Sequence, residues 1–187
     1  RRAPTLGLFG GVHGLERVGT HVVLAWLDTL FARLTWDTAL QRALEDTRIV
    51  CMPLINPGGM FLGKRSNPNG VDLMRNAPVD ALVRPTFLVG GHRLGPWLPW
   101  YRGQPGQGLE PESQALVDFV QAELFQARSA LSVDFHSGFG TADRLWYPYA
   151  KTTASFPRVL EARGLAQLLS ATHPHHVYEV EPQSVHY

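Results

Sequence analysis

The chain has 187 residues, of which 44% are hydrophobic and 18% charged, and its formal net charge is +1. This length suits one globular domain with its own core, and the near-neutral charge excludes a broad electrostatic case for binding nucleic acid or an anionic membrane. The lone Cys51 excludes an internal disulfide framework, and no apolar run approaches the roughly 20 residues that span a bilayer. With one cysteine and no visible leader, we expect a cytoplasmic protein, with neither nucleic acid nor membrane among its partners.

The first third of the chain alternates strand-like and helix-like segments. The apolar residues 5–9 predict a strand, and residues 18–34 repeat apolar side chains every three or four positions, the spacing of a helix packed on a sheet. The same period extends over residues 36–44 and predicts a second short helix. The continuous apolar run 48–55 predicts a strand buried on both faces, which residues 56–59 (NPGG) end.

The middle of the chain predicts a long loop. Residues 60–107 hold many Gly and Pro and show no sustained period, and a loop this long in a compact domain is usually functional or disordered. After it we predict, in order, a helix over 111–128, a buried strand over 130–135, a strand over 144–149, a helix over 156–171 interrupted by Gly164, and a short strand over 177–180. The alternation predicts an α/β fold with a mixed, largely parallel β-sheet flanked by helices.

The two ends of the chain bear on domain organisation. The chain begins with Arg1 almost directly before the first strand, and it ends on the strand-like residues 185–187. We interpret residues 1–187 as a single domain truncated at both ends, with N-terminal strands and a later C-terminal strand lying outside it.

Two residues of metal-ligand type follow the first strand. His13 and Glu16 lie three positions apart in the glycine-rich turn 10–16, which joins that strand to the following helix. Such a turn projects both side chains past the C-terminal end of the strand, where open α/β sheets build their sites. Imidazole nitrogen and carboxylate oxygen are both zinc ligands, but two ligands do not hold a catalytic metal.

His136 is the candidate for a third ligand. It follows the predicted strand 131–135 directly, as His13 follows the first strand. Two strand ends side by side in one sheet place His13, Glu16 and His136 around one point. Two histidines and one glutamate leave a fourth position for water, as in catalytic zinc sites. The sequence therefore predicts one zinc ion held by these three residues.

Four short blocks carry a resemblance to a known family. They are residues 11–16 (GVHGLE), 56–59 (NPGG), 69–76 (NGVDLMRN) and 134–137 (DFHS), in that order. In these blocks the chain resembles the zinc metallocarboxypeptidase family, which includes pancreatic carboxypeptidases, bacterial murein-peptide amidases, and the related succinylglutamate desuccinylase and aspartoacylase group. The resemblance covers nearly the whole chain. It implies a zinc carboxypeptidase-like fold and a hydrolase in which zinc-bound water attacks an amide bond near a substrate carboxylate.

The resemblance also implies roles for single residues. His13, Glu16 and His136 would be the zinc ligands. Arg65 resembles the arginine that polarises the scissile carbonyl and holds the developing oxyanion, which suits a guanidinium that keeps its charge. Arg75 resembles the arginine that grips the substrate's terminal carboxylate with a bidentate contact.

Residues around these positions either support or depart from the family pattern. We expect Asp72 to orient a ligand histidine or its loop, and Asp134 to give structural support beside His136. The family usually has Asn where this chain has Met74, and a thioether cannot donate a hydrogen bond to a carboxylate. Recognition of a free C-terminus is therefore weakened, with Asn76 as the neighbouring candidate for substrate binding.

The general base of the family is a glutamate on a late strand, after a tyrosine that closes over the substrate. Tyr187 stands where that tyrosine would fall, and we assign it this catalytic role. Glu179 and Glu181 do not match the place of the base, so we expect the base beyond this chain. The base takes a proton from water that the metal has made more acidic, so the chain by itself would bind metal with little or no hydrolysis.

Three functions stay open on this evidence. The leading one is zinc-dependent hydrolysis of the metallocarboxypeptidase type, with a peptide as substrate. The second is an N-acyl amino acid deacylase of the desuccinylase–aspartoacylase type, which shares the metal site. The third is a catalytically inactive zinc-binding module of the same fold, for which Met74 and the missing base argue. The sequence leaves the oligomeric state open.

Overall fold

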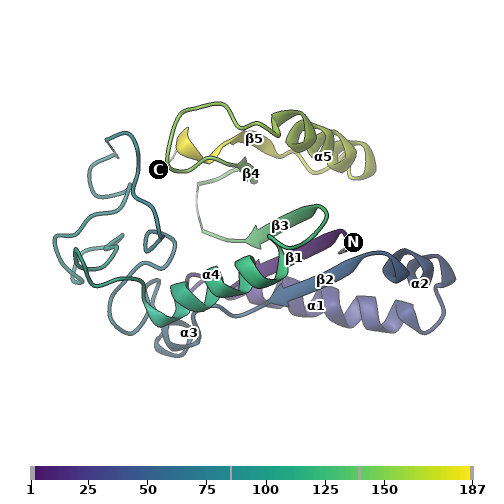
Figure 1. Cartoon of the computed structure of the whole chain (residues 1–187), viewed down its shortest axis with the longest axis horizontal. Helices are drawn as coiled ribbons and strands as arrows, with labels where there is room; N and C mark the ends of the chain where they lie inside the picture. Colours follow the sequence, from purple (N-terminus) through teal and green to yellow (C-terminus); the bar gives the residue numbers. More distant parts are fainter. Residues whose placement is uncertain (1–2, 85, 139, 186–187) are drawn as a thin grey trace. The chain divides into compact units, whose positions relative to one another are not determined.

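The computed structural model describes residues 3–84, 86–138 and 140–185. The chain divides into two compact units, one comprising Arg1–Ala77 with Arg93–Gly138 and the other Pro78–His92 with Phe139–Tyr187. Each unit has its own sheet (Figure 1). That residues 1–187 form a single domain stays a prediction.

The first unit is built on a three-stranded sheet with the strand order β2-β1-β3. The central strand β1 (Thr5–Gly10) pairs in parallel with both β2 (Arg48–Met52) and β3 (Ala130–Phe135). The register sets Gly10 opposite Phe135, so the carboxyl ends of β1 and β3 meet at one edge of the sheet. Every described strand pair is parallel, in agreement with the predicted α/β class.

The described residues of this unit form four helices: α1 (Arg17–Leu34), α2 (Thr38–Glu45), α3 (Pro57–Leu62) and α4 (Pro111–Glu123). α1 and α2 connect β1 to β2, and α4 precedes β3. Among the helices described, none combines the length and apolar character that crossing a membrane requires.

The sheet of the first unit lies between α1 and α4 (Figure 1). The ring of Phe9 packs against that of Phe119 in α4, with centroids 5.9 Å apart. At Gly10 the side-chain position faces the opposite side of the sheet, where an added Cβ would lie 2.7 Å from the carbonyl of Gly19 in α1. Because successive strand residues point to opposite faces, the two helices cover opposite sides of β1. The chain thus changes side at β1, which is where open α/β sheets bind ligands.

The core of this unit lies between the sheet and α4. Its buried members come from β1, three loops and the residue that follows α4, and they are Phe9, Val12, Ile55, Leu73 and Leu124. Val12 immediately precedes His13, and Leu73 immediately follows Asp72. Packing of the core therefore anchors two of the segments that carry candidate site residues.

The second unit contains β4 (Arg144–Tyr147), β5 (Glu179–Pro182), α5 (Val159–Thr172) and the short 3-10 helix Gln183–Val185. β4 and β5 pair in parallel, with Arg144 opposite Glu179. Arg144 binds the carboxylates of both Glu179, at 2.8 Å, and Glu181. Both glutamates therefore take part in holding the two strands together.

Two predicted strands are less buried than expected. β2 ends at Met52 and is half-buried throughout, and β3 has mostly exposed side chains, with Leu131 46% exposed. Among the described residues, each of these strands pairs only with β1, so each lies at an edge of the sheet. An apolar run shows that a strand forms, but it does not encode whether that strand is central.

Two helices also differ from prediction. Residues 56–59 were expected only to end a strand, but Pro57 begins α3 there. The side-chain oxygen of Asn56 accepts the N–H of Gly59 at 2.8 Å, which caps this helix. α5 continues through Gly164, where we predicted an interruption. Glycine within a helix costs about 1 kcal/mol relative to alanine, and that penalty need not break the helix.

Gly19 provides the first test of the packing. A Cβ at this position would lie 2.1 Å from the carbonyl oxygen of Phe135, the residue before His136. Since relief requires backbone movement, we expect Gly19→Ala to lower the free energy of unfolding by about 1–3 kcal/mol in urea titrations followed by circular dichroism.

The control for this substitution is Gly164→Ala. Gly164 lies within α5 and has open space around its Cα. The same change should there raise the free energy of unfolding by about 0.5–1 kcal/mol. A neutral Gly19→Ala would contradict the close approach of α1 to the end of β3.

Candidate metal centre

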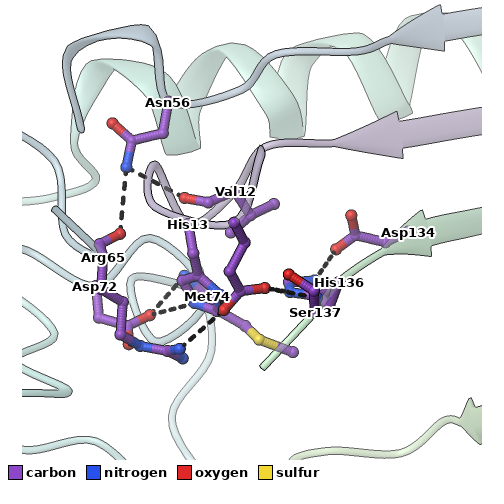
Figure 2. Close-up of polar contacts among 10 residues, drawn as sticks. Val12, His13, Asn56, Arg65, Asp72, Met74, Asp134, His136 and Ser137 are labelled. Carbon is purple, nitrogen blue, oxygen red and sulfur yellow. Dashed lines mark hydrogen bonds and ion pairs between the residues drawn. The ribbon is translucent and has the colours of Figure 1, made fainter. Parts of the chain in front are cut away.

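Two histidines and a glutamate converge beyond the ends of β1 and β3. One ligand-type atom from each of His13, Glu16 and His136 lies within 4.8 Å of the others. Nδ1 of His13 is 2.9 Å from Oε1 of Glu16, and Nδ1 of His136 is 3.3 Å from Oε2 of the same carboxylate. The two imidazole rings are 5.1 Å apart and nearly edge-to-face (Figure 2). The structure thus brings together the three residues predicted as zinc ligands.

The local backbone explains this convergence. The register of β1 with β3 brings the turn after Gly10 beside the residue after Phe135. Within the turn, the N–H of Glu16 donates to the carbonyl of His13 at 3.0 Å, which directs both side chains to one place. Glu16 stands at the cap position of α1 but makes no side-chain capping bond there. Its carboxylate is used by the site instead.

A carboxylate lies behind each histidine. Nε2 of His13 is 3.3 Å from Oδ1 of Asp72, and Nε2 of His136 is 2.6 Å from Oδ2 of Asp134. An ionised carboxylate only accepts, so Nε2 carries the proton in each contact and Nδ1 is the nitrogen turned to Glu16. Partners of this kind fix the ring orientation of metal-binding histidines. Asp72 and Asp134 thus contact the predicted ligand histidines.

The residues present fit a zinc ion. His13 is 2% exposed, and its Nδ1 makes no hydrogen bond within the described residues even though Glu16 is close. A buried polar atom left unsatisfied costs free energy, which a bound cation would recover. Two imidazole nitrogens and one carboxylate oxygen form a donor set that zinc uses with a fourth, open position.

Arg65 closes a ring of contacts around this centre. Its Nη1 lies 3.1 Å from Oε1 of Glu16, and its Nε donates to Oδ2 of Asp72 at 3.0 Å. Asp72 in turn binds His13, and His13 adjoins Glu16. We call the four residues His13, Asp72, Arg65 and Glu16 the contact ring. Arg65 is 30% exposed, so its guanidinium reaches the surface of the site.

The two carboxylates of the contact ring are ionised at neutral pH. Burial opposes ionisation of Glu16, but the proximity of His13, the hydrogen bond with His136 and the N–H of Ser137 outweigh it and hold the pKa of Glu16 well below its usual value. Burial likewise opposes ionisation of Asp72. Its contact with His13 and the nearby positive charges outweigh burial and hold the pKa of Asp72 low. Both residues need this negative charge for their predicted roles, Glu16 as a ligand of the cation and Asp72 as the partner of a ligand histidine.

His136 shows the reverse effect. Burial lowers its pKa, but the hydrogen bonds to Asp134 and Glu16 outweigh burial and raise the pKa to about 9. A metal ion at this place would take over the role of that proton, because ligand nitrogens must be deprotonated to bind.

The predicted substrate-binding residues lie next to the contact ring in sequence. Arg75 is buried, at 7% exposure, and its charge contributes to the low pKa of Asp72. The amide of Asn76 donates to the carbonyl of Arg102 at 2.9 Å and accepts the N–H of Glu110 at 2.8 Å. The structure therefore gives Asn76 a bridging role between loops, and its contact with substrate stays a prediction.

Two further residues concern the predicted chemistry. Met74 packs half-buried against the core of this unit, and its N–H donates to Oδ1 of Asp72 at 3.1 Å. Tyr187, to which we assigned a catalytic role, lies outside the described residues.

Sequence reasoning missed two residues that contact the site. The backbone N–H of Ser137 donates to Oε2 of Glu16 at 2.9 Å, and the buried amide of Asn56 donates to the carbonyls of Val12 and Arg65. An Asn directly before Pro signals a helix start, which was available for Asn56. Its bonds to residues remote in sequence leave no local signal.

Comparison with known proteins agrees with this geometry. A family model described as zinc carboxypeptidase matches residues 1–186. The catalytic chain of mouse carboxypeptidase N is 29% identical over 164 residues, covering 80% of this chain and 34% of that protein. Carboxypeptidase E of Caenorhabditis elegans is 28% identical over 160 residues, covering 78% and 32%. The chain spans about a third of the length of these curated relatives.

Solved structures show the same fold. A crystal structure of thrombin activatable fibrinolysis inhibitor matches with a TM-score of 0.75 at 18% identity, covering 99% of this chain and 47% of that one. The murein-tripeptide amidase MpaA from Escherichia coli O157 matches with a TM-score of 0.51 at 23% identity, covering 100% and 64%. The predicted fold class is therefore confirmed.

Asp72 gives a test of the support behind His13. We expect Asp72→Asn, which keeps the shape and removes the charge, to weaken zinc binding by about 10–100-fold in competition with a chelator. The control is Asp118→Asn, because Asp118 is exposed in α4 and its bond is to Gln114. Equal zinc affinity in the two variants would show that Asp72 does not orient the ligand.

Proposed function

The chain belongs to the zinc carboxypeptidase family, and from this premise we propose that it forms the metal-binding part of a zinc-dependent hydrolase that cleaves a peptide bond near a substrate carboxylate. The observation that carries the proposal is the cluster of His13, Glu16 and His136, with a carboxylate behind each histidine. The buried Nδ1 of His13, which lacks a hydrogen bond within the described residues, supports a cation at this point.

These three residues would hold one zinc ion. When bound, the ion supplies a Lewis acid that polarises an amide carbonyl and lowers the pKa of water. Asp72 and Asp134 accept hydrogen bonds from Nε2 of the two histidines, so that the lone pair of each Nδ1 would be available to bind the ion. The N–H of Ser137 fixes the second oxygen of Glu16.

Arg65 would stabilise the negative charge that develops on the carbonyl oxygen. Its Nε and Nη1 are held by Asp72 and Glu16, so the guanidinium has one orientation before substrate arrives. Its partial exposure leaves donors of Nη2 for the substrate oxygen. A donor placed in advance is worth more than one that must reorganise during the reaction.

Arg75 would attract the carboxylate of the substrate by its charge. Met74 beside it offers no hydrogen-bond donor from its side chain. Met74 is half-buried and packs against the core of this unit. A second candidate is an N-acyl amino acid deacylase, whose substrate also carries a free carboxylate that Arg75 would attract. Both candidates use the same metal ligands.

Zinc content tests the metal centre. The unmodified chain should retain about one zinc ion after dialysis, and His13→Ala and His136→Ala should each lose at least about 100-fold in zinc affinity, since removing a ligand exceeds the loss of an outer partner. His173→Ala is the control, because His173 is exposed after α5. An unmodified chain without zinc would refute the proposal.

Hydrolysis by the natural full-length protein tests the chemistry. We expect Arg65→Ala to lower kcat by about 100- to 1,000-fold, the usual loss when one oxyanion donor is removed, while zinc content stays constant. Comparing a peptide C-terminus with an N-acyl amino acid separates peptidase from deacylase. Absence of both reactions in the zinc-loaded protein would identify an inactive module.

A further inference from the structure

The side chain of Asn56 links two segments of the metal centre. It is fully buried, with 0% exposure. Its Nδ2 donates to the carbonyl of Val12 at 3.2 Å and to the carbonyl of Arg65 at 3.5 Å, and its Oδ1 accepts the N–H of Gly59 at 2.8 Å. Figure 2 shows the amide between the turn that carries His13 and the backbone of Arg65.

Backbone packing supports this link. The N–H of Asn56 donates to the carbonyl of Gly11 at 2.9 Å, and the N–H of Gly14 donates to the carbonyl of Arg65 at 3.3 Å. A Cβ at Gly14 would lie 2.1 Å from the backbone of Gly59. The turn after β1 and the segment around α3 are therefore in direct contact, and the amide of Asn56 is buried where they meet.

We propose that Asn56 is a positioning residue that sets the place of Arg65 relative to the metal ligands. It acts through the backbone, because it holds the carbonyl of Val12, directly before His13, and the carbonyl of Arg65 itself. Its catalytic consequence rests on the proposed function, but its structural part does not. A displacement of a catalytic group by about 1 Å costs on the order of 100-fold in rate.

The chemistry of the carboxamide explains why asparagine stands here. Ser, Thr, Asp and Asn all serve as helix caps, so the bond to Gly59 does not by itself require Asn. Binding carbonyl oxygens requires an N–H donor at the end of a side chain of this length. An ionised aspartate lacks that donor, and serine is too short to replace it. Among these four residue types, only asparagine can both cap α3 and donate hydrogen bonds to the two carbonyls.

The first test separates these two tasks. Asn56→Ser keeps an oxygen for the cap of α3 but loses both bonds to the carbonyls. We expect solvent exchange of the Arg65 Nε proton, followed by NMR, to become about tenfold faster, the size expected from losing a buried hydrogen bond. Exchange of the Gly59 amide proton should stay close to its original rate.

Asn69→Ser is the matched control. It makes the same change in the loop that carries Arg65, but the exposed amide of Asn69 binds Glu110. Arg65 exchange should not change in this variant. If Asn56→Ser also leaves Arg65 exchange unchanged, the positioning role is wrong, whether or not the protein hydrolyses any substrate.

The second test concerns catalysis by the natural full-length protein. Asn56→Ser should lower kcat by about 10–100-fold with little change in zinc affinity, and it should cause no further loss when Arg65 is already alanine. A loss that persists in the Arg65→Ala background would overturn the proposal, because Asn56 would then act elsewhere. If the unmodified protein hydrolyses nothing, the proposed function is wrong, but the exchange test still decides whether Asn56 positions Arg65.

A third measurement uses the unmodified chain and needs no folded variant. The side-chain N–H protons of Asn56 should exchange about tenfold more slowly than those of Asn69, because both amides are bonded but only that of Asn56 is buried. Equal exchange rates for the two amides would overturn the proposal.

Discussion

The parallel pairing of β1 with β3 is the constraint on which the rest of the metal centre depends. It sets Gly10 beside Phe135, so that His13 and Glu16 leave the sheet where His136 does. Because side chains alternate along a strand, a slip of one residue would turn His136 towards the other face. The close approach of Gly19 in α1 to the carbonyl of Phe135 restricts such a slip. The site is thus a product of strand register rather than of either loop alone.

The charges of the site are arranged so that no buried carboxylate stands alone. Glu16 contacts both histidines and Arg65, and Asp72 contacts His13 and Arg65. Burying unpaired charges costs several kcal/mol, so a constellation of this kind persists only when each charge has a partner. The same pairing orients the imidazole rings and the guanidinium, which links the stability of the centre to its chemistry.

Much of the fold was predictable because its signals are local. The helical period after β1, and ligand-type residues directly after two strands, indicated α1 and the cluster of His13, Glu16 and His136. The remainder depends on tertiary structure. The partners of Asn56 lie 44 and 9 residues away, and nothing near β2 or β3 in the sequence marks them as edge strands. Gly164 shows the opposite error. The low helix propensity of glycine predicted an interruption there, but α5 continues through this residue.

The contact ring of His13, Asp72, Arg65 and Glu16 closes on itself, so each member has two neighbours within it. Replacing any one of them releases two contacts at once, and the effects of paired replacements will not add. For a lineage acquiring new substrates, this makes the ring a poor place to begin. Variation is less costly at residues outside it, such as Met74, where one side chain can change while the four members of the ring keep one another in place.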